Sequence, residues 1–261
     1  MNILISNDDG ILAPGLRCLA NTLAQQSDYR ITVVSPDRER SATGHALTMH
    51  KPLRADPITE GFAPSIQAWS CTGTPSDCVK LGMDGLMETK PDWVISGINQ
   101  GSNLGTDVLY SGTVSAAMEG LMEEIPSMAV SLASWGGEDF QPAADFIVTF
   151  LQKLHHNPLP ELALLNINVP AVPTAQIRGA VIAPLGIRKY TDIYEKRLDP
   201  RGKIYYWLAG EVLNDGIDPN CDIRAVQENY VSITPLQPNL TATASFPMLT
   251  RWGLSPFLGK D

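Results

Sequence analysis

The sequence predicts an α/β protein with a Rossmann-like, doubly wound, mostly parallel sheet and a β-rich C-terminal extension. Short, almost uninterrupted apolar segments recur up to about residue 173, and amphipathic segments with helical spacing separate them. Parallel strands are buried on both faces, which makes them continuous apolar runs, and the crossovers between them are right-handed. We therefore divide the chain into a core, residues 1–173, and an extension with hairpins, residues 174–261.

The expected elements of the core alternate along the chain. Thr74 is an N-cap, Pro75 stands at the first helical position and Asp77 is the acid three residues after the cap, which predicts a helix start. Strands are expected at residues 2–6, 31–35, 93–96, 127–132 and 162–169, and helices at residues 15–26, 74–87, 113–124 and 142–155. In the extension, strands are expected at residues 176–183, 187–194, 203–208 and 230–235, and a short helix at residues 247–258.

Composition and charge exclude several classes of protein. The 44% hydrophobic and 18% charged content is that of a globular chain, so disorder is not expected. A formal charge of −9 without a basic stripe argues against binding to nucleic acid or to anionic membranes. No apolar run is long enough to span a membrane, no signal-peptide pattern is present, and the four cysteines lack disulfide or zinc spacing. We expect a cytoplasmic protein with free thiols.

Two adjacent carboxylates follow the first expected strand, at Asp8 and Asp9. Past the end of the strand, where the chain turns through Gly10, both side chains can reach the same side, and two anions held close repel unless a cation lies between them. Mg²⁺ and Mn²⁺ prefer such carboxylates together with neutral oxygens, which Ser41 and Asn99 would supply from neighbouring strand ends. Taken alone, this acidic pair would also fit a solvated turn or a helix cap.

Glycine-rich loops follow the strand at residues 93–96. They lead to Ser111, Gly112 and Thr113, where a helix of small residues begins. Unpaired N–H groups at a helix N-terminus bind phosphate without basic side chains, which suits an acidic chain. An ordinary capped loop is the alternative. The loops contain neither a phosphate-loop lysine motif nor a dinucleotide fingerprint, and the chain has no nucleophile elbow or zincin motif. His45, in the loop after the second strand, is either an acid, a substrate contact or a plain loop residue.

These loops together resemble the SurE family over nearly the whole chain. The resemblance implies a metal-dependent phosphomonoesterase that hydrolyses nucleoside 5′-monophosphates, with 3′-monophosphates and short polyphosphate as further substrates. The motifs are Asn7-Asp8-Asp9-Gly10, Pro36-Asp37-Arg38 with Ser41, Gly73-Thr74-Pro75-Ser76-Asp77-Cys78, Ser96-Gly97-Ile98-Asn99 with Asn103-Leu104-Gly105, Tyr110-Ser111-Gly112-Thr113, Asn166-Ile167-Asn168-Val169-Pro170 and Tyr230-Val231-Ser232-Ile233-Thr234-Pro235-Leu236.

The resemblance also assigns roles to individual residues. It implies one divalent metal ion per subunit, Mg²⁺ or Mn²⁺, and a homodimer or homotetramer that exchanges C-terminal elements, with no nucleic-acid or membrane partner. The implied metal ligands are Asp8, Asp9, Ser41 and Asn99, with Asp8, Asp9 and Asn99 catalytic, and the implied phosphate contacts are Asn103, Ser111, Gly112 and Thr113. Ser41 is followed by Ala42 where many relatives have glycine, which concerns the mobility of the 40–50 loop.

The residues leave two alternatives for the function and two for the mechanism. A haloacid-dehalogenase-like phosphatase needs a second aspartate two positions after the first, but residue 10 is glycine. A non-enzymatic nucleotide or metal sensor would use the same cleft. Asp8 would either accept the proton of the attacking water or attack as the nucleophile.

Overall fold

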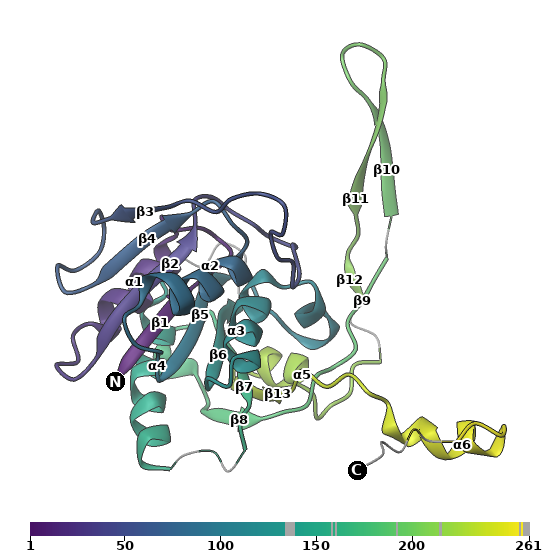
Figure 1. Ribbon diagram of the computed structural model, residues 1–261. Helices are drawn as coiled ribbons and strands as arrows, with labels where there is room; N and C mark the ends of the chain where they lie inside the picture. The colour runs from purple at the N-terminus through teal and green to yellow at the C-terminus, as the bar shows by residue number, and fades with distance from the viewer. Residues whose placement is uncertain are drawn as a thin grey trace.

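The computed structural model describes residues 1–133, 139–157, 159, 161–191, 193–213, 216–255 and 257. Within these residues one large sheet has nine strands in the order β3-β4-β2-β1-β5-β6-β7-β13-β8 (Figure 1). The strands are β1 (Asn2–Ser6), β2 (Arg30–Pro36), β3 (Ala55–Ile58), β4 (Gln67–Cys71), β5 (Trp93–Gln100), β6 (Ser127–Ala133), β7 (Leu164–Pro170), β8 (Ala180–Ile182) and β13 (Val231–Leu236).

The centre of the sheet is parallel. Strand β1 pairs with β2 and β5, and β5, β6 and β7 continue in the same direction. Antiparallel pairs lie toward the edges, between β3 and β4 and between β7 and β13. The predicted α/β, mostly parallel sheet is therefore confirmed.

Helices cover both faces of the sheet. They are α1 (Pro14–Leu23) and α4 (Gln141–His156), which contact each other, and α2 (Pro75–Leu81) and α3 (Gly112–Met122), which also contact each other. The predicted capping box opens α2, because the Thr74 hydroxyl accepts from Asp77 N–H and the Asp77 carboxylate accepts from Thr74 N–H. Beyond α2 the predicted helix continues as a π-helical turn, η1 (Gly82–Leu86).

Alternating side chains of β1 fill two separate cores. Ile3 and Ile5 pack in the cluster that includes α1 and α4, while Leu4 packs in the cluster that includes α2. All three side chains are fully buried. Successive side chains of a strand point to opposite faces, so a strand covered on both faces needs an unbroken apolar run.

The C-terminal part contributes to the same sheet. Strand β13 pairs with β7 and with β8, so the sheet runs across the division expected at residue 173. The strand expected at residues 187–194 is not continuous, because β9 is Lys189–Tyr190 and β10 begins at Ile193. The short helix α5 (Asp222–Gln227) and the edge strands β3 and β4 were not expected.

A hairpin and a terminal arm stand away from the sheet (Figure 1). The hairpin consists of β10 (Ile193–Leu198) and β11 (Ile204–Ala209), and β12 (Val212–Leu213) pairs with β9 at its base. Helix α6 (Phe246–Arg251) is shorter than the helix expected at residues 247–258, part of which lies outside the described residues. None of the helices in the described part of the chain is long and apolar enough to cross a membrane.

Candidate metal and phosphate site

The turn after β1 presents the two carboxylates at the carboxyl edge of the sheet. The Asn7 side chain bridges this turn, since its Nδ2 donates to Gly10 O at 3.0 Å and its Oδ1 accepts from Gly10 N–H at 3.2 Å. Gly10 has a φ of +98°, and a Cβ at this position would lie 3.0 Å from the backbone carbon of Arg38. Glycine is therefore required both for the turn and for the close approach of the next loop.

Asp8 lies directly against the N-terminus of α3. Its side chain is buried, and its Oδ1 accepts a hydrogen bond from the Thr113 hydroxyl. A Cβ on Gly112 would lie only 2.7 Å from the Asp8 Cβ, so the helix packs against this carboxylate without room for a side chain. The structure thus brings together Asp8, Gly112 and Thr113, which the sequence assigns to the metal and to the phosphate.

Asp9 joins the ends of β1 and β5. Its Oδ2 accepts from Gln100 N–H at 3.3 Å. The neighbouring Asn99 donates from Nδ2 to Gly101 O at 2.8 Å, so its Oδ1 is not engaged by that bond. Asp8, Asp9 and Asn99 therefore belong to the ends of the paired strands β1 and β5, and their joint binding of a metal stays a prediction.

The electrostatics of this pair favour a cation. Burial raises the pKa of Asp8, and it outweighs the hydrogen bonds from the Thr113 hydroxyl and from backbone N–H groups, which lower it. Burial, and then the nearby charge of Asp8, raise the pKa of Asp9 to about 6. Glu39 adds a further negative charge that raises both pKa values. A bound cation would remove this mutual repulsion.

Ser41 is placed differently from the other three predicted ligands. The side chain is exposed, and its hydroxyl donates to Glu39 Oε1 at 2.7 Å. The preceding residue is nevertheless fixed at the site, because Arg40 N–H donates to Asp8 O at 2.7 Å. This bond uses the hydroxyl hydrogen of Ser41 and leaves the lone pairs of its oxygen for a metal.

The start of α3 is a capped helix N-terminus. The Ser111 hydroxyl accepts from Val114 N–H at 3.1 Å, so this side chain already serves as the N-cap. Thr113 N–H is bonded to Asp8, so among the first-turn N–H groups it is that of Gly112 that remains for a phosphate, and the helix dipole adds positive potential there. The sequence allowed either a capped loop or a phosphate-binding helix N-terminus here, and the two are compatible at this position.

Asn103 is buried beneath the loop that follows β5. Its Nδ2 donates to Ser131 Oγ at 2.8 Å, and its peptide is held by two further asparagine side chains, Asn166 and Asn168. Neither asparagine is among the site residues predicted from the sequence. The signal was present, because Asn166 and Asn168 interrupt an otherwise apolar, fully buried strand.

The same loop is bonded to the C-terminal part of the chain. Gly105 N–H donates to the buried carboxylate of Asp222 at 2.8 Å, and Gly186 N–H donates to its other oxygen at 2.8 Å. Arg188 Nη1 binds Asp107 Oδ2 at 2.9 Å. Residues from the two expected parts of the chain therefore share one hydrogen-bonded assembly.

His45 does not lie free in its loop. Its Nε2 is 2.6 Å from Glu119 Oε2, and Glu119 is a buried carboxylate of α3 that also pairs with Lys80 at 3.5 Å. A buried carboxylate needs such partners. The structure thus shows His45 as a tether between the 40–50 loop and α3.

The donor set at the strand ends fits a hard divalent ion. The part of the chain that the structure describes contains no cluster of three or more His, Cys, Asp or Glu side chains arranged to hold a metal. Mg²⁺ needs only one or two carboxylates, with neutral oxygens and water completing its shell. The side chains of Asp8, Asp9 and Asn99 are of these types, and the hydroxyl of Ser41 is a further neutral oxygen.

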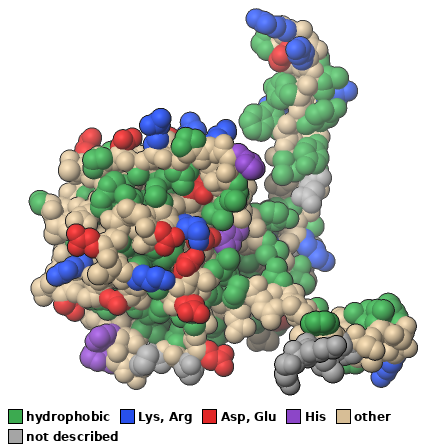
Figure 2. All heavy atoms as spheres, in the orientation of Figure 1, with side chains coloured by type: hydrophobic (Ala, Val, Ile, Leu, Met, Phe, Trp, Pro, Cys, Tyr) green, Lys and Arg blue, Asp and Glu red, His purple; other side chains and the backbone are tan. Residues whose placement is uncertain are grey.

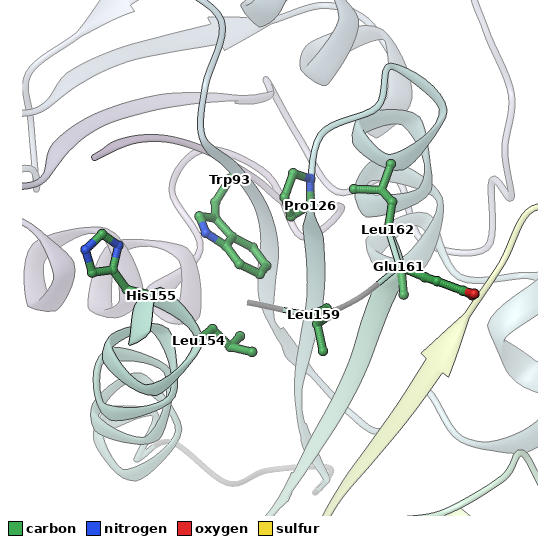
Figure 3. A pocket seen from close by; sticks show the side chains of 8 residues that line it. Trp93, Pro126, Leu154, His155, Leu159, Glu161 and Leu162 are labelled. Carbon is green, nitrogen blue, oxygen red and sulfur yellow. The ribbon is translucent and has the colours of Figure 1, made fainter. Parts of the chain in front are cut away.

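A separate apolar hollow lies at the opposite edge of the sheet (Figure 3). It has a volume of about 280 Å³, and its lining includes Trp93, Pro126 and Leu154. Trp93 begins β5 and Pro126 directly precedes β6, so this hollow is at the amino-terminal end of the parallel strands. It is therefore distinct from the carboxyl edge, where ligands of doubly wound sheets bind.

The fold and these contacts define an α/β protein with paired carboxylates that face a helix N-terminus at the carboxyl edge of a parallel sheet. The family described as "Survival protein SurE" matches residues 3–192. The chain belongs to the SurE family.

Individual relatives are similar over almost their full lengths. A protein of Synechococcus sp. (strain JA-3-3Ab) named "5'-nucleotidase SurE" is 69% identical over 257 residues, which cover 98% of this chain and 99% of the relative. A protein of the same name from Cyanothece sp. (strain PCC 7425 / ATCC 29141) is 57% identical, covering 99% and 98%. The crystal structure of the SurE protein from Aquifex aeolicus matches with a TM-score of 0.82 at 37% identity, covering 97% of this chain and all of that one.

Proposed function

We propose that this protein is a metal-dependent 5′-nucleotidase, which hydrolyses nucleoside 5′-monophosphates to nucleoside and phosphate. The contact of Asp8 with Gly112 and Thr113 is the observation that carries the proposal, because it sets a carboxylate against a helix N-terminus suited to phosphate. The names of the similar Synechococcus and Cyanothece proteins support the same activity.

In this proposal Asp8, Asp9, Asn99 and the hydroxyl oxygen of Ser41 hold one divalent ion, Mg²⁺ or Mn²⁺. When bound, the ion supplies positive charge to the phosphoryl oxygens and acidifies water. The chain itself orients the phosphoryl group, through the backbone N–H group of Gly112 and the amide of Asn103.

We assign the proton transfer to Asp8. Its carboxylate lies against the helix N-terminus that is proposed to hold the phosphoryl group, and the Thr113 hydroxyl fixes its orientation. The alternative is direct attack of Asp8 on phosphorus. Trapping a phosphoryl group on Asp8 after acid quenching would contradict the assignment as base.

The assay that tests the activity measures phosphate release from AMP with Mg²⁺, with Mn²⁺ and with EDTA. We expect release with a divalent ion and none with EDTA. Parallel reactions with 3′-AMP and tripolyphosphate test the two further substrate classes. No release above background with either ion would overturn the enzymatic proposal and favour a nucleotide or metal sensor.

The raised carboxylate pKa values predict how pH and metal change stability. Because folding raises the pKa of Asp9 from 3.8 to about 6, its stabilising contribution is greatest below the unfolded pKa and is lost as the pH rises through the folded one. The metal-free protein should therefore melt on the order of 5 °C higher at about pH 5 than at about pH 7.

Differential scanning calorimetry checks this prediction. Asp9→Asn should flatten the dependence on pH. Excess Mg²⁺ should raise the melting temperature more at about pH 7, where both carboxylates are charged, than at about pH 5. A Mg²⁺ effect of equal size at both pH values would contradict the site.

We also propose that the chain forms homodimers or homotetramers through its hairpin. Exposed apolar side chains lie along the β10–β11 ribbon (Figure 2), and an isolated two-stranded hairpin is at best marginally stable in water. Trp207 and Leu208 point to opposite faces and are 60% and 65% exposed, so a second copy of the chain would bury both.

Replacing both side chains by glutamate should convert the oligomer to a smaller species in sedimentation velocity. Lys196→Gln, on the same hairpin, is the matched control and should leave the oligomer intact. A double variant that sediments like the unmodified protein would contradict this interface.

The protein is also proposed to be cytoplasmic, because its cysteines are free thiols.

A further inference from the structure

The loop after β5 contains one residue, Asn103, whose backbone N–H and C=O are both bonded to side chains. Asn103 N–H donates to Asn168 Oδ1 at 2.8 Å, and Asn168 Nδ2 donates back to Asn103 O at 3.0 Å. The Asn168 amide therefore binds both polar groups of the same residue. This arrangement reproduces the pairing that a neighbouring strand would provide.

Two other side chains complete the support. Asn166 Nδ2 donates to Asn103 O at 2.9 Å, and Ser131 Oγ accepts from Asn103 Nδ2 at 2.8 Å. Asn166, Asn168 and Ser131 are all fully buried, on the adjacent strands β6 and β7. Buried polar groups without alternative partners have one low-energy arrangement, so both the backbone and the amide plane of Asn103 are fixed.

We propose that Asn168 is a positioning residue, which sets the Asn103 peptide and thereby the affinity of the loop for the phosphoryl group. This inference rests on the proposed function, in which Asn103 contacts phosphate. With one Nδ2 hydrogen bonded to Ser131, the second hydrogen has a fixed direction and donates to the ligand. Loss of Asn168 frees the peptide to rotate and to form its bonds with water instead.

Binding of inorganic phosphate, measured by titration calorimetry with excess Mg²⁺, tests the inference without turnover. Asn168→Ala should weaken phosphate binding about tenfold, because two buried hydrogen bonds are lost. Asn166→Ala, which removes one bond, should weaken it by a smaller factor. The matched control is Ser232→Ala, since Ser232 is the cross-strand neighbour of Asn168 and its buried hydroxyl has no partner among the described residues.

Steady-state kinetics separate a loss of Asn103 positioning from a general loss of folded structure. The KM for AMP and the KM for p-nitrophenyl phosphate should rise by the same factor in Asn168→Ala, because the two substrates share only the phosphoryl group. Hydrogen exchange at Asn103 N–H should accelerate, while the other amides of β7 stay protected. If Asn168→Ala does not fold, the same measurements are made on Asn166→Ala and on Ser131→Ala.

The outcomes are distinct from those of the activity assay. Unchanged phosphate affinity in the folded variants would overturn the inference, and so would a wild-type protein that binds no phosphate. A wild-type protein that binds phosphate but releases none from AMP would overturn the proposed function and leave this positioning role to be decided by the phosphate titration alone.

Discussion

Asp8→Asn should lower kcat/KM for AMP by at least about 100-fold while the protein stays folded. Loss of a residue that supports a metal ligand typically costs 10–100-fold, and loss of a ligand itself should cost no less. Asparagine keeps the size of the side chain and an oxygen that accepts from the Thr113 hydroxyl, so the packing against α3 is preserved. Phosphate release and thermal unfolding measure the two parts of this result.

The change in thermal stability of this variant should also have a definite direction. Replacing a buried carboxylate by a neutral amide removes a desolvated charge and the repulsion on Asp9, so the metal-free variant should melt at or above the wild-type temperature near neutral pH. Asp84→Asn, at an exposed position in η1, is the matched control and should change neither property. An Asp8→Asn protein with wild-type activity would show that the site is misassigned.

Gly112→Ala should have a comparable effect on activity through geometry alone. The added Cβ would lie 2.7 Å from the Asp8 Cβ and 2.9 Å from its Oδ2, closer than carbon atoms pack. Either the carboxylate or the start of α3 must move, and a displacement of about 1 Å at an active site costs about 100-fold. The overpacking should also cost about 1–3 kcal/mol in the free energy of unfolding.

Gly120→Ala in the same helix is the matched control for the effect of overpacking on stability. Its Cβ would lie 2.6 Å from Ser127 Oγ and 2.7 Å from the Val94 Cβ, far from the carboxylates in the packing of α3 against the sheet. We expect a loss of about 1–3 kcal/mol in the free energy of unfolding with kcat/KM unchanged. Steady-state kinetics and urea unfolding of the two variants should therefore separate catalysis from stability. Two glycine variants with the same profile would contradict the packing of Gly112 against Asp8.

The central sheet could be predicted because its strands are buried on both faces. Ile3, Leu4 and Ile5 show why, since each needs an apolar neighbour on one side of the sheet or the other. The edge strand β3 was not predictable by the same rule, because its sequence includes the exposed residues Asp56 and Pro57 and none of its residues is buried. Helix α5 is too short to show helical periodicity and depends on the tertiary bonds of Asp222.

The site was predictable where residues follow strand ends directly. Asp8, Asp9 and Asn99 lie at adjacent ends because parallel strands terminate at one edge of the sheet. Ser41 lies farther along a loop, and its hydroxyl orientation depends on competition with Glu39 that no sequence pattern specifies. The bonds from Asn166 and Asn168 to Asn103 depend on strand register, which emerges only when β5, β6 and β7 are aligned.

The bond from Gly105 to Asp222 spans 117 residues of sequence. During synthesis the strands from β1 to β7 emerge before this carboxylate does, and domains begin to fold from the N-terminal side. Contacts of such separation form late, because the intervening chain must be ordered first. The phosphate loop would thus be completed only after Asp222 has been synthesised, so a nascent chain that has already formed the strands from β1 to β7 would still be inactive.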